Sequence, residues 1–333
     1  MNKALSKALN KAQNEAQNKA LNIGVIGGSR YFGKRLVGQL QAAGHRLTVI
    51  NRGSTTPPPG VEHLVVDRDD EAALTEALGD RTFDVVIDQV CYTPVQAAIA
   101  ARAFAGRTGR YVMTSTIEVY DPATTDRLDA TEGEPLRETT VDPAAWPIDL
   151  ALPWHDAAYL EAHYAEGKRQ AEAVFTQHGG LPFVSVRSAH VLGGGAEEFT
   201  GRLDHYAGRV LRGETIDVHR GAASPTVFIH HREIADLLAW AALGDFTGPV
   251  NAASHGLLDV RDFSAVVAAR TGREPVYREV AADASPFSFD RFYAMSNARA
   301  EQLGFRFTRT ADWLPGAVDE TLAAHEALTA AFA

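Results

Sequence analysis

The sequence predicts an α/β fold, with a doubly wound parallel sheet and a smaller C-terminal lobe. Short continuous apolar runs alternate with longer helical patterns from Asn22 onward, and a glycine-rich turn at 27–33 follows the first apolar run. Continuous apolar runs are typical of parallel strands that are buried on both faces, which requires helices on both sides of the sheet. The chain has 333 residues, of which 45% are hydrophobic, so it is long enough to bury such a core.

The expected elements alternate in a regular order. The expected strands are 23–26, 47–50, 64–66, 83–87, 111–113 and 183–186, with returns to the sheet at 226–229 and 250–252. The expected helices run from the glycine turn to about residue 43, over 71–78, from Pro94 onward, and over roughly 156–177. Between Asp121 and Asp156 neither the continuous apolar runs of strands nor the helical pattern continues, so we expect a long surface loop there. Loops of this length are usually functional or mobile.

Charge and cysteine content exclude several classes of function. The chain carries −10 at pH 7, and its first 22 residues contain four Lys and one Glu, so the remainder carries −13. Binding to nucleic acid or to an anionic membrane depends on clustered Lys and Arg, so we expect neither partner and expect a small-molecule substrate. No run of 18 apolar residues is present, and Cys91 is the single cysteine. These features are typical of a reducing, cytoplasmic setting.

The turn after the first strand has the composition of a dinucleotide-binding turn. Between a strand and a helix, free N–H groups and the helix dipole favour a pyrophosphate. The turn reads G-x-x-R-x-x-G, with Arg30 where a third glycine is often found. The residues that we assign to the cofactor here are Gly27, Gly28, Ser29, Arg30, Tyr31, Phe32 and Gly33. The alternative is a tight strand–helix turn without a ligand.

The end of the second strand indicates which nicotinamide cofactor binds. In NAD sites an acid about 20 residues beyond the glycines binds the adenosine ribose diol. Here that strand ends in Asn51 and Arg52. A guanidinium can bind the 2′-phosphate of NADP as a planar fork, so we expect NADP in preference to NAD. The alternative is that Arg52 is a solvated turn residue.

These patterns divide the chain into a leader and two units. Residues 1–21 carry a four-residue repeat that begins KALSKALN. A period of four gives a helix no stable apolar seam, so we expect a disordered or frayed leader. We expect residues 22–192 with about 225–257 to form the dinucleotide-binding domain, and about 193–224 with 258–333 to form the substrate lobe.

Tyr164 and Lys168 lie four residues apart in a predicted helix, so both side chains project from one face. After the first 22 residues the chain contains 26 Arg and only two Lys, Lys34 and Lys168, which indicates that a compact ammonium is needed at 168. A cation within ~4–6 Å favours the phenolate of a tyrosine and lowers its pKa from about 10. The pair predicts acid/base catalysis. The alternative is an exposed helical pair without a function.

A resemblance to a known family emerges once these motifs are combined. Hydroxyls at the carboxyl end of a parallel strand lie where α/β sheets bind ligands. The motifs stand at Gly27–Gly33, Ser115-Thr116, Val119-Tyr120, Tyr164/Lys168, Arg187 through Gly193, and Phe228–His230. They resemble the extended short-chain dehydrogenase/reductases of the NAD-dependent epimerase/dehydratase family, over residues 22 to 310. The resemblance implies a Rossmann sheet and a nicotinamide cofactor.

The resemblance also implies roles for individual residues. Tyr164 is the expected acid/base, Lys168 holds the nicotinamide ribose and lowers the pKa of the tyrosine, and Thr116 binds the substrate oxygen. The remaining assignments are Asp67, Arg68, Val90, Ser188 and His190 at the cofactor, and Cys91, Tyr92 and Glu118 as candidate substrate contacts. Ser188 and His190 are expected to flank the nicotinamide.

Two departures from the family pattern narrow the function. Sugar-nucleotide dehydratases carry Thr-Asp-Glu before Val-Tyr, whereas this chain has Thr116, Ile117 and Glu118. The acid for the leaving hydroxyl is therefore missing, which disfavours 4,6-dehydration. Glu118 is either a substrate contact or a solvated acid at a strand end. The arginine at position 30, where a glycine is often found, resembles the pattern of a subgroup that includes chloroplast stem-loop RNA-binding proteins. Those proteins generally lack the complete Tyr/Lys pair, which this chain has.

The sequence therefore predicts an NAD(P)-dependent oxidoreductase or epimerase that acts on a secondary alcohol or ketone of a sugar or nucleotide sugar. The alternative is a non-catalytic dinucleotide-binding sensor or an RNA-associated scaffold. We predict no metal site, because no histidine pair has metal-ligand spacing with a carboxylate, and His230 and His231 at a helix start are more typical of structural histidines. A homodimer is expected from the resemblance alone.

Overall fold

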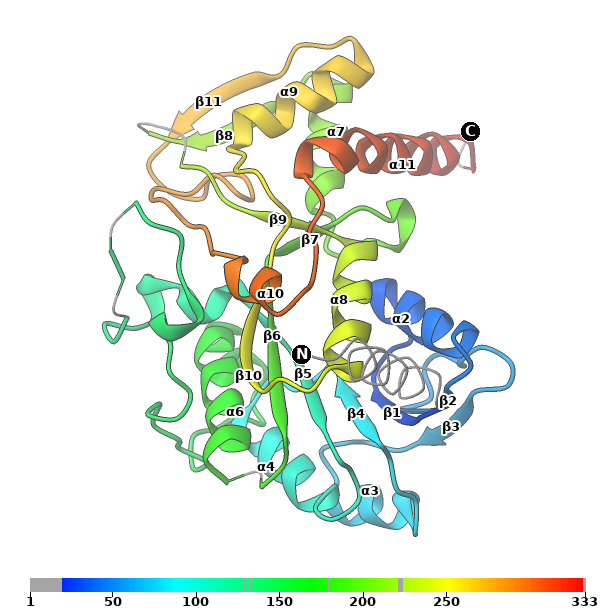
Figure 1. Cartoon of the computed structure of the whole chain (residues 1–333). Coiled ribbons are helices and arrows are strands. Elements are labelled where there is room, and N and C mark those ends of the chain that lie inside the picture. The colour runs from blue at the N-terminus through cyan, green and yellow to red at the C-terminus, as the bar shows by residue number, and fades with distance from the viewer. Residues whose placement is uncertain (1–19, 129, 132, 179, 221–223, 332–333) are drawn as a thin grey trace, which may run out of the picture.

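Seven parallel strands form one sheet at the centre of the computed structural model, which describes residues 20–128, 130–131, 133–178, 180–220 and 224–331 (Figure 1). The strands are β1 (Asn22–Ile26), β2 (Arg46–Asn51), β3 (Glu62–Val65), β4 (Val85–Asp88), β5 (Tyr111–Thr116), β6 (Phe183–Ser188) and β10 (Gly248–Ala252). Their order is β3-β2-β1-β4-β5-β6-β10. The chain reverses direction across the sheet between β1 and β4, which is where doubly wound sheets bind ligands. The predicted fold class is confirmed.

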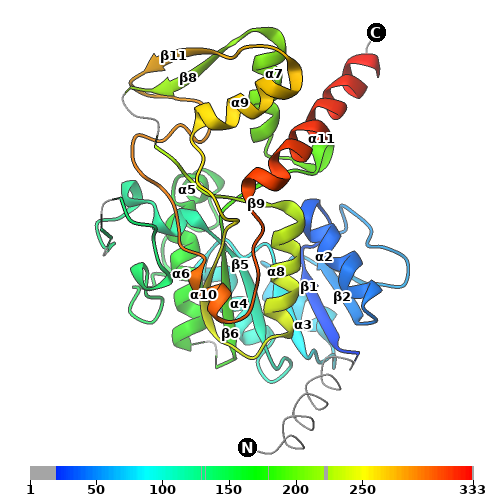
Figure 2. The ribbon, with the colours of Figure 1, turned by 45° about the horizontal axis from the view of Figure 1, so that its top comes forward.

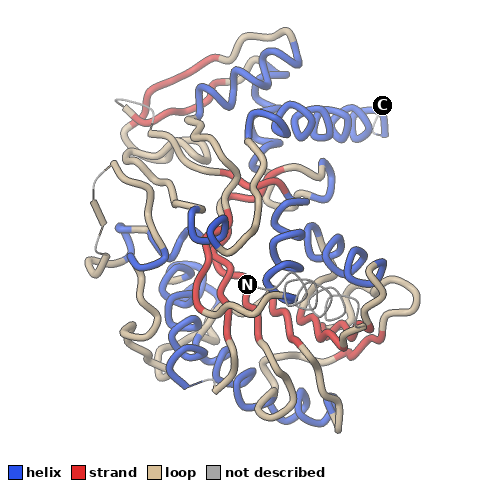
Figure 3. Tube along the Cα trace, in the orientation of Figure 1, coloured by secondary structure: helices blue, strands red, loops and turns tan. Residues whose placement is uncertain are grey.

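Helices cover both faces of the sheet (Figure 3). One face carries α2 (Tyr31–Ala42) and α8 (His231–Leu243), and the other carries α3 (Glu71–Leu78), α4 (Pro94–Ala103) and α6 (Tyr164–His178). Successive side chains of β1 point to opposite faces of the sheet. Val25 packs in the core under α2 and α8, whereas Ile26 packs in the core under α3 and α4. This is the two-sided burial that continuous apolar strands predict.

The helix predicted over 156–177 is two helices, α5 (Ala157–Ala162) and α6. His163 separates them with φ −119° and ψ 26°, which lies outside the α-helical region. Helix α6 therefore begins at Tyr164, and Lys168 lies about one turn further along.

One predicted return to the main sheet, at 226–229, is wrong. Strand β9 (Phe228–His230) pairs in parallel with β7 (His190–Leu192) in a separate two-stranded sheet. The reason is that β10 already occupies the place beside β6 in the main sheet. The return expected at 250–252 is confirmed as part of β10.

A smaller lobe stands over the carboxyl ends of the strands (Figure 2). Its elements are α7 (Arg202–Arg212), β8 (Thr215–His219), α9 (Val260–Thr271), β11 (Val276–Val280) and α11 (Thr310–Ala331). They share a separate core that includes Leu203, Tyr206, Phe263 and Leu314. The short helix α10 (Ala298–Gln302) returns to the main sheet and lies beside β10.

The stretch between residues 121 and 156 is irregular, as expected, but part of it is buried rather than at the surface. It contains the short 3-10 helices η2 (Pro122–Thr124) and η3 (Glu138–Thr140). Val141 and Trp146 are buried, and Trp146 Nε1 donates to Glu166 Oε1 at 3.1 Å. The segment is therefore packed against helix α6.

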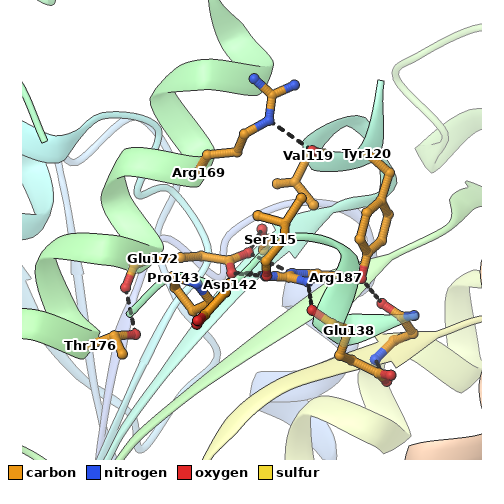
Figure 4. A network of polar contacts seen from close by, with 12 residues as sticks. Ser115, Val119, Tyr120, Glu138, Asp142, Pro143, Arg169, Glu172, Thr176 and Arg187 are labelled. Carbon is orange, nitrogen blue, oxygen red and sulfur yellow. Dashed lines mark hydrogen bonds and ion pairs between the residues drawn. The ribbon is translucent and has the colours of Figure 1, made fainter. Parts of the chain in front are cut away.

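A buried polar network joins this segment to the sheet (Figure 4). Arg187 on β6 and Glu172 on α6 form an ion pair of 2.6 Å between Nη2 and Oε2, with both side chains fully buried. Ser115 on β5 donates to Glu172 Oε1 at 2.6 Å. Arg187 also donates to the carbonyl oxygens of Glu138 and Val141 at 2.8 and 2.9 Å. Two strands, one helix and the irregular segment are thus held at one point.

The expected leader falls almost wholly on residues 1–19, which lie outside the described part of the chain. None of the described helices combines the length and the apolar character that a bilayer span requires.

Candidate functional site

Three glycines shape the turn between β1 and α2. Gly27 and Gly28 have φ values of 89° and 75°, conformations that favour glycine. A Cβ on Gly33 would lie 2.1 Å from Gln89 Oε1 and 3.0 Å from the Cα of Gly28. The turn therefore needs glycine at these positions, because two of them have positive φ values and the third packs too closely for a side chain.

A cavity of about 540 Å³ lies over this turn and over the ends of β1, β2 and β4. The predicted cofactor residues that line it are Gly27, Gly28, Ser29, Arg30, Tyr31, Phe32, Asn51, Arg52, Asp67, Arg68 and Val90. The structure thus brings residues from four separate segments to one hollow, at the switch point where doubly wound sheets bind nucleotides.

Asn51, Ser29 and the two exposed arginines have different parts in the cavity wall. Asn51 Nδ2 donates to Ser29 Oγ at 2.7 Å, and Asn51 Oδ1 accepts from the backbone N–H of Gly53 at 2.7 Å. The Asn51 side chain is therefore committed to holding the turn. Arg30 and Arg52 are exposed, and neither guanidinium has an ion pair within the described ranges of the chain. Both are available to an anionic ligand in the cavity.

Arg68 reaches the cavity from a buried ion pair. Its Nη1 lies 2.6 Å from Asp88 Oδ2, and its Nη2 donates to the carbonyl oxygen of Gln96 at 3.0 Å. Tyr111 also donates to Asp88 Oδ2, at 2.7 Å. The guanidinium is therefore occupied by the protein itself, whereas Asp67 beside it is exposed and lines the cavity.

Lys168 is almost fully buried, with 2% of its surface exposed. Its Nζ donates to the carbonyl oxygen of Thr114 at 2.9 Å and lies 4.6 Å from the centre of the Tyr92 ring. Burial lowers the pKa of Lys168 to about 8, while the thiol of Cys91 and the carboxylate of Asp88 oppose this shift. The ammonium is thus held at the end of β5 by neutral oxygen and π-electron donors.

Tyr164 lies beside Thr116, whose hydroxyl acts to lower the pKa of the phenol. The Tyr164 ring lies 5.9 Å from Lys168 Nζ and 6.2 Å from the Tyr92 ring. Burial raises the pKa of the Tyr164 phenol, which is opposite to the lowering expected from Lys168. The physical reason is that loss of water around the phenol outweighs the nearby charge, since the ammonium is directed to the Thr114 carbonyl.

Tyr92 connects the two parts of the site. It lines the cavity, and its ring contacts both Lys168 and Tyr164. By contrast, its neighbour Cys91 is fully buried within the core and does not line the cavity. Burial raises the pKa of the Cys91 thiol to about 12. Cys91 therefore offers no surface to a substrate, because the side chain after a strand end turns inward here.

Glu118 faces two residues that the sequence did not predict, Tyr293 and Arg202. Tyr293 Oη donates to the carbonyl oxygen of Ile117 at 3.0 Å and lies 3.3 Å from Glu118 Oε2. Burial raises the pKa of Glu118, and the charge of Arg202 opposes that shift. The charge of Arg202 also acts to lower the pKa of the Tyr164 phenol. Glu118 is thus half-buried near Tyr164 rather than a solvated acid.

Ser188 and His190 lie outside the lining of the cavity. Ser188 Oγ donates to the carbonyl oxygen of Ala189 at 2.9 Å. The His190 ring packs near Phe287 and Phe289, with centroids 5.0 and 5.8 Å away. Burial lowers the pKa of His190 to about 3, so the imidazole is neutral. His190 forms part of an aromatic cluster with Phe287 and Phe289.

Comparison with known proteins agrees with this geometry. Residues 23–105 match the model of the NAD dependent epimerase/dehydratase family, which confirms the predicted resemblance over the segment that carries the glycine turn. The chain is also 34% identical, over 139 residues, to 2′-dehydrokanamycin reductase from Streptomyces kanamyceticus. That match covers 41% of this chain and 39% of the reductase, so the chain matches about two fifths of the reductase's length.

Solved structures share the fold over most of the chain. UDP-glucose 4-epimerase from Thermus thermophilus, in complex with NAD, has a TM-score of 0.67 at 21% identity, over 91% of this chain and 99% of the epimerase. dTDP-glucose 4,6-dehydratase from Streptomyces venezuelae, with NAD bound, has a TM-score of 0.69 at 17% identity, over 91% of this chain and 97% of the dehydratase. At these identities the similarity establishes the fold alone.

The lowered pKa of Lys168 gives a testable pH dependence. The ammonium is charged below a pH of about 8 and neutral above it, so a ligand that needs this cation binds more weakly as the pH rises through that value. We expect the dissociation constant of NADPH, measured by fluorescence titration, to rise through that range. Lys168→Met, which has no charge at any pH, should bind more weakly throughout and show no such step. A flat wild-type profile would contradict the assignment of Lys168 to the cofactor.

Proposed function

We propose that this chain, whose cofactor turn is similar to that of the NAD-dependent epimerase/dehydratase family, is an NADP-dependent oxidoreductase. It interconverts a ketone and a secondary alcohol on a sugar or nucleotide sugar. The observation that carries the proposal is the meeting of Tyr164, Lys168 and Thr116 at the end of β5, next to a cavity built on a glycine turn. A tyrosine acid/base beside a cation and a hydroxyl is suited to moving a proton on and off an alcohol oxygen.

The residues around the cavity fit a dinucleotide. The positive φ values of Gly27 and Gly28 and the close packing at Gly33 shape the turn that leads into α2, and the N-terminus of a helix suits a pyrophosphate. Arg30 and Arg52 are exposed on the cavity wall and suit the 2′-phosphate of NADP. Lys168 would hold the nicotinamide ribose. When bound, the nicotinamide supplies the hydride.

Tyr164 moves the proton. In the reducing direction, the phenol donates its proton to the carbonyl oxygen of the substrate as that oxygen becomes an alcohol. Its raised pKa keeps it protonated at neutral pH, which suits the role of an acid. The ammonium of Lys168, 5.9 Å from the ring, stabilises the phenolate left behind. Thr116 orients the same oxygen by a hydrogen bond.

The substrate binds on the side of the smaller lobe. We assign this lobe to about 193–224 and 258–333, and its Arg202 and Tyr293 lie next to Glu118. Ile117, where a sugar-nucleotide dehydratase carries an acid, is buried and apolar, which argues against 4,6-dehydration. Reduction of a ketone on a glycoside is favoured by the partial match to 2′-dehydrokanamycin reductase. The homodimer expected from the resemblance stays a prediction.

An assay separates this enzyme from the alternative, a non-catalytic dinucleotide sensor or RNA-associated scaffold. The full chain is mixed with NADPH and a panel of ketone-bearing sugars, including a 2′-keto aminoglycoside and 4-keto nucleotide sugars, and nicotinamide absorbance is followed. Sustained oxidation by the wild type supports the proposal. Tight NADPH binding without turnover of any member of the panel would favour the sensor.

Cofactor preference provides the next prediction. We expect NADP(H) to bind at least ten-fold more tightly than NAD(H), a difference in binding free energy of about 1.4 kcal/mol. The reason is that Arg52, rather than an acid, follows β2. Arg52→Asp should reverse the preference, since a carboxylate repels the 2′-phosphate and accepts hydrogen bonds from the ribose diol. Arg306→Asp, at an exposed arginine outside the cavity lining, is the matched control. Equal affinities for the two cofactors in the wild type would contradict the prediction.

The catalytic assignment predicts distinct effects at two positions. Tyr164→Phe removes only the phenolic oxygen, so NADPH should still bind while turnover falls by ~10²–10⁴-fold, the usual effect of losing a positioned acid/base. Thr116→Val should lower turnover, whereas Thr116→Ser should keep much of it because only the hydroxyl is needed. Steady-state kinetics and NADPH titrations of the same preparations provide the test. Full activity in Tyr164→Phe would remove Tyr164 from the mechanism.

A further inference from the structure

Two histidines and a glutamate converge at the junction between the sheet domain and the C-terminal helix. His230 ends β9, His231 begins α8, and Glu320 lies within α11. One ring nitrogen of each histidine and one carboxylate oxygen of Glu320 lie within 4.8 Å of one another. Ligands held at ~2 Å from a shared Zn²⁺ ion lie ~3–3.5 Å apart, so small side-chain rotations are enough to bring the three donors to one ion.

Three consecutive glycines, at 193–195, form a turn that packs against these side chains. A Cβ on Gly193, where φ is 91°, would lie 2.8 Å from His230 Nε2. A Cβ on Gly194 would lie 3.4 Å from His231 Nδ1, and one on Gly195 would lie 2.8 Å from the carbonyl oxygen of Glu320. The backbone of the turn thus packs against all three members of the cluster, and a side chain at Gly193 or Gly195 would clash with His230 or Glu320.

The histidines have the protonation state that metal binding needs. His231 is 8% exposed, and its Nε2 is buried without a hydrogen-bond partner in the described residues. A buried ring nitrogen without a partner is costly and calls for an explanation. Burial lowers the pKa of both imidazoles, that of His230 to about 3. Both rings are therefore neutral at physiological pH and can coordinate a cation without first losing a proton.

The carboxylate keeps free coordination sites despite its hydrogen bonds. The backbone N–H of Gly194 donates to Glu320 Oε2 at 2.8 Å, and Arg232 Nη2 lies 3.1 Å from Oε1. A carboxylate has about four lone-pair sites, and these two contacts use only part of them. The Arg232 side chain is 53% exposed and that of Glu320 is 36% exposed, so their ion pair is weak and yields readily. Arg35 also adds positive charge near the histidines, and Glu197 offsets it.

We propose that His230, His231 and Glu320 bind a divalent transition-metal cation, of which Zn²⁺ is the best match to two imidazole nitrogens and one carboxylate oxygen. The ion would join helix α11 to the β9–α8 junction. It would also fix the His231 ring, on which Tyr31 of the cofactor turn is stacked at 5.7 Å with an interplanar angle of 4°. The site is separate from Tyr164 and Lys168, and its role is to stabilise the contact between the lobes rather than to act in the reaction.

The test uses the full, untagged chain after removal of metals with a chelator. Zn²⁺ is titrated calorimetrically, and Co²⁺ is titrated while its visible absorption is recorded, since that absorption reports the geometry of the ligands. We expect one ion per chain. Glu320→Gln keeps the hydrogen bond from Gly194 but loses the charge, and His231→Phe keeps the stacking on Tyr31 but loses the nitrogens. Each should weaken binding by at least ~10-fold, the lower range for disturbing a metal site.

Glu301→Gln is the matched control, because Glu301 lies 2.9 Å from His255 Nε2 in a histidine–glutamate pair without a third ligand among the described residues. It should bind Zn²⁺ as the wild type does. Saturating Zn²⁺ should also raise the Tm of the wild type and of Glu301→Gln but not that of Glu320→Gln. Absence of binding, or equal affinities in the wild type and in Glu320→Gln, would overturn the proposal. Neither result depends on whether the chain is a reductase.

Discussion

The buried ion pair between Arg187 and Glu172 is the interaction on which the rest of the structure depends. Both side chains are fully buried, so each charge relies on the other. The other N–H groups of Arg187 donate to Tyr120 Oη at 2.8 Å and to two carbonyl oxygens of the irregular 121–156 segment. Tyr120 in turn donates to Asn251 on β10 at 2.8 Å. One guanidinium therefore links strand β6, helix α6, the edge strand and the irregular segment.

This constraint explains why the proposed catalytic side chains meet. Glu172 lies about one helical turn after Lys168 and about two after Tyr164 on α6, so docking of Glu172 sets the position of both. Ser115 donates to the same carboxylate and directly precedes Thr116 at the end of β5. A single carboxylate thus aligns the helix and the strand that form the site. The smaller lobe lies outside this network, and under the proposed function it is the part of the chain that selects the substrate.

Local patterns were enough to predict much of this arrangement. The glycine turn and the Tyr164/Lys168 pair depend on short spacings, and both lie where those spacings indicated. Contacts between distant segments leave no such pattern. Arg202 is one of 26 arginines in the sequence, and Glu320 comes near His231 only because α11 packs beside β9. Burial was the other effect that local patterns could not predict. Desolvation raises the pKa of Tyr164, whereas the nearby lysine alone suggested a lower pKa.

A double-mutant cycle on Glu172 and Arg187 tests the central claim most directly. The free energy of unfolding is measured by denaturant titration for the wild type, Glu172→Met, Arg187→Met and the double variant. Each single variant leaves one buried charge uncompensated, so each should lose about 3–5 kcal/mol. The double variant removes both charges and should be at least as stable as either single variant, which corresponds to a large coupling energy. Losses that simply add would contradict the account, because the two charges would then not depend on each other.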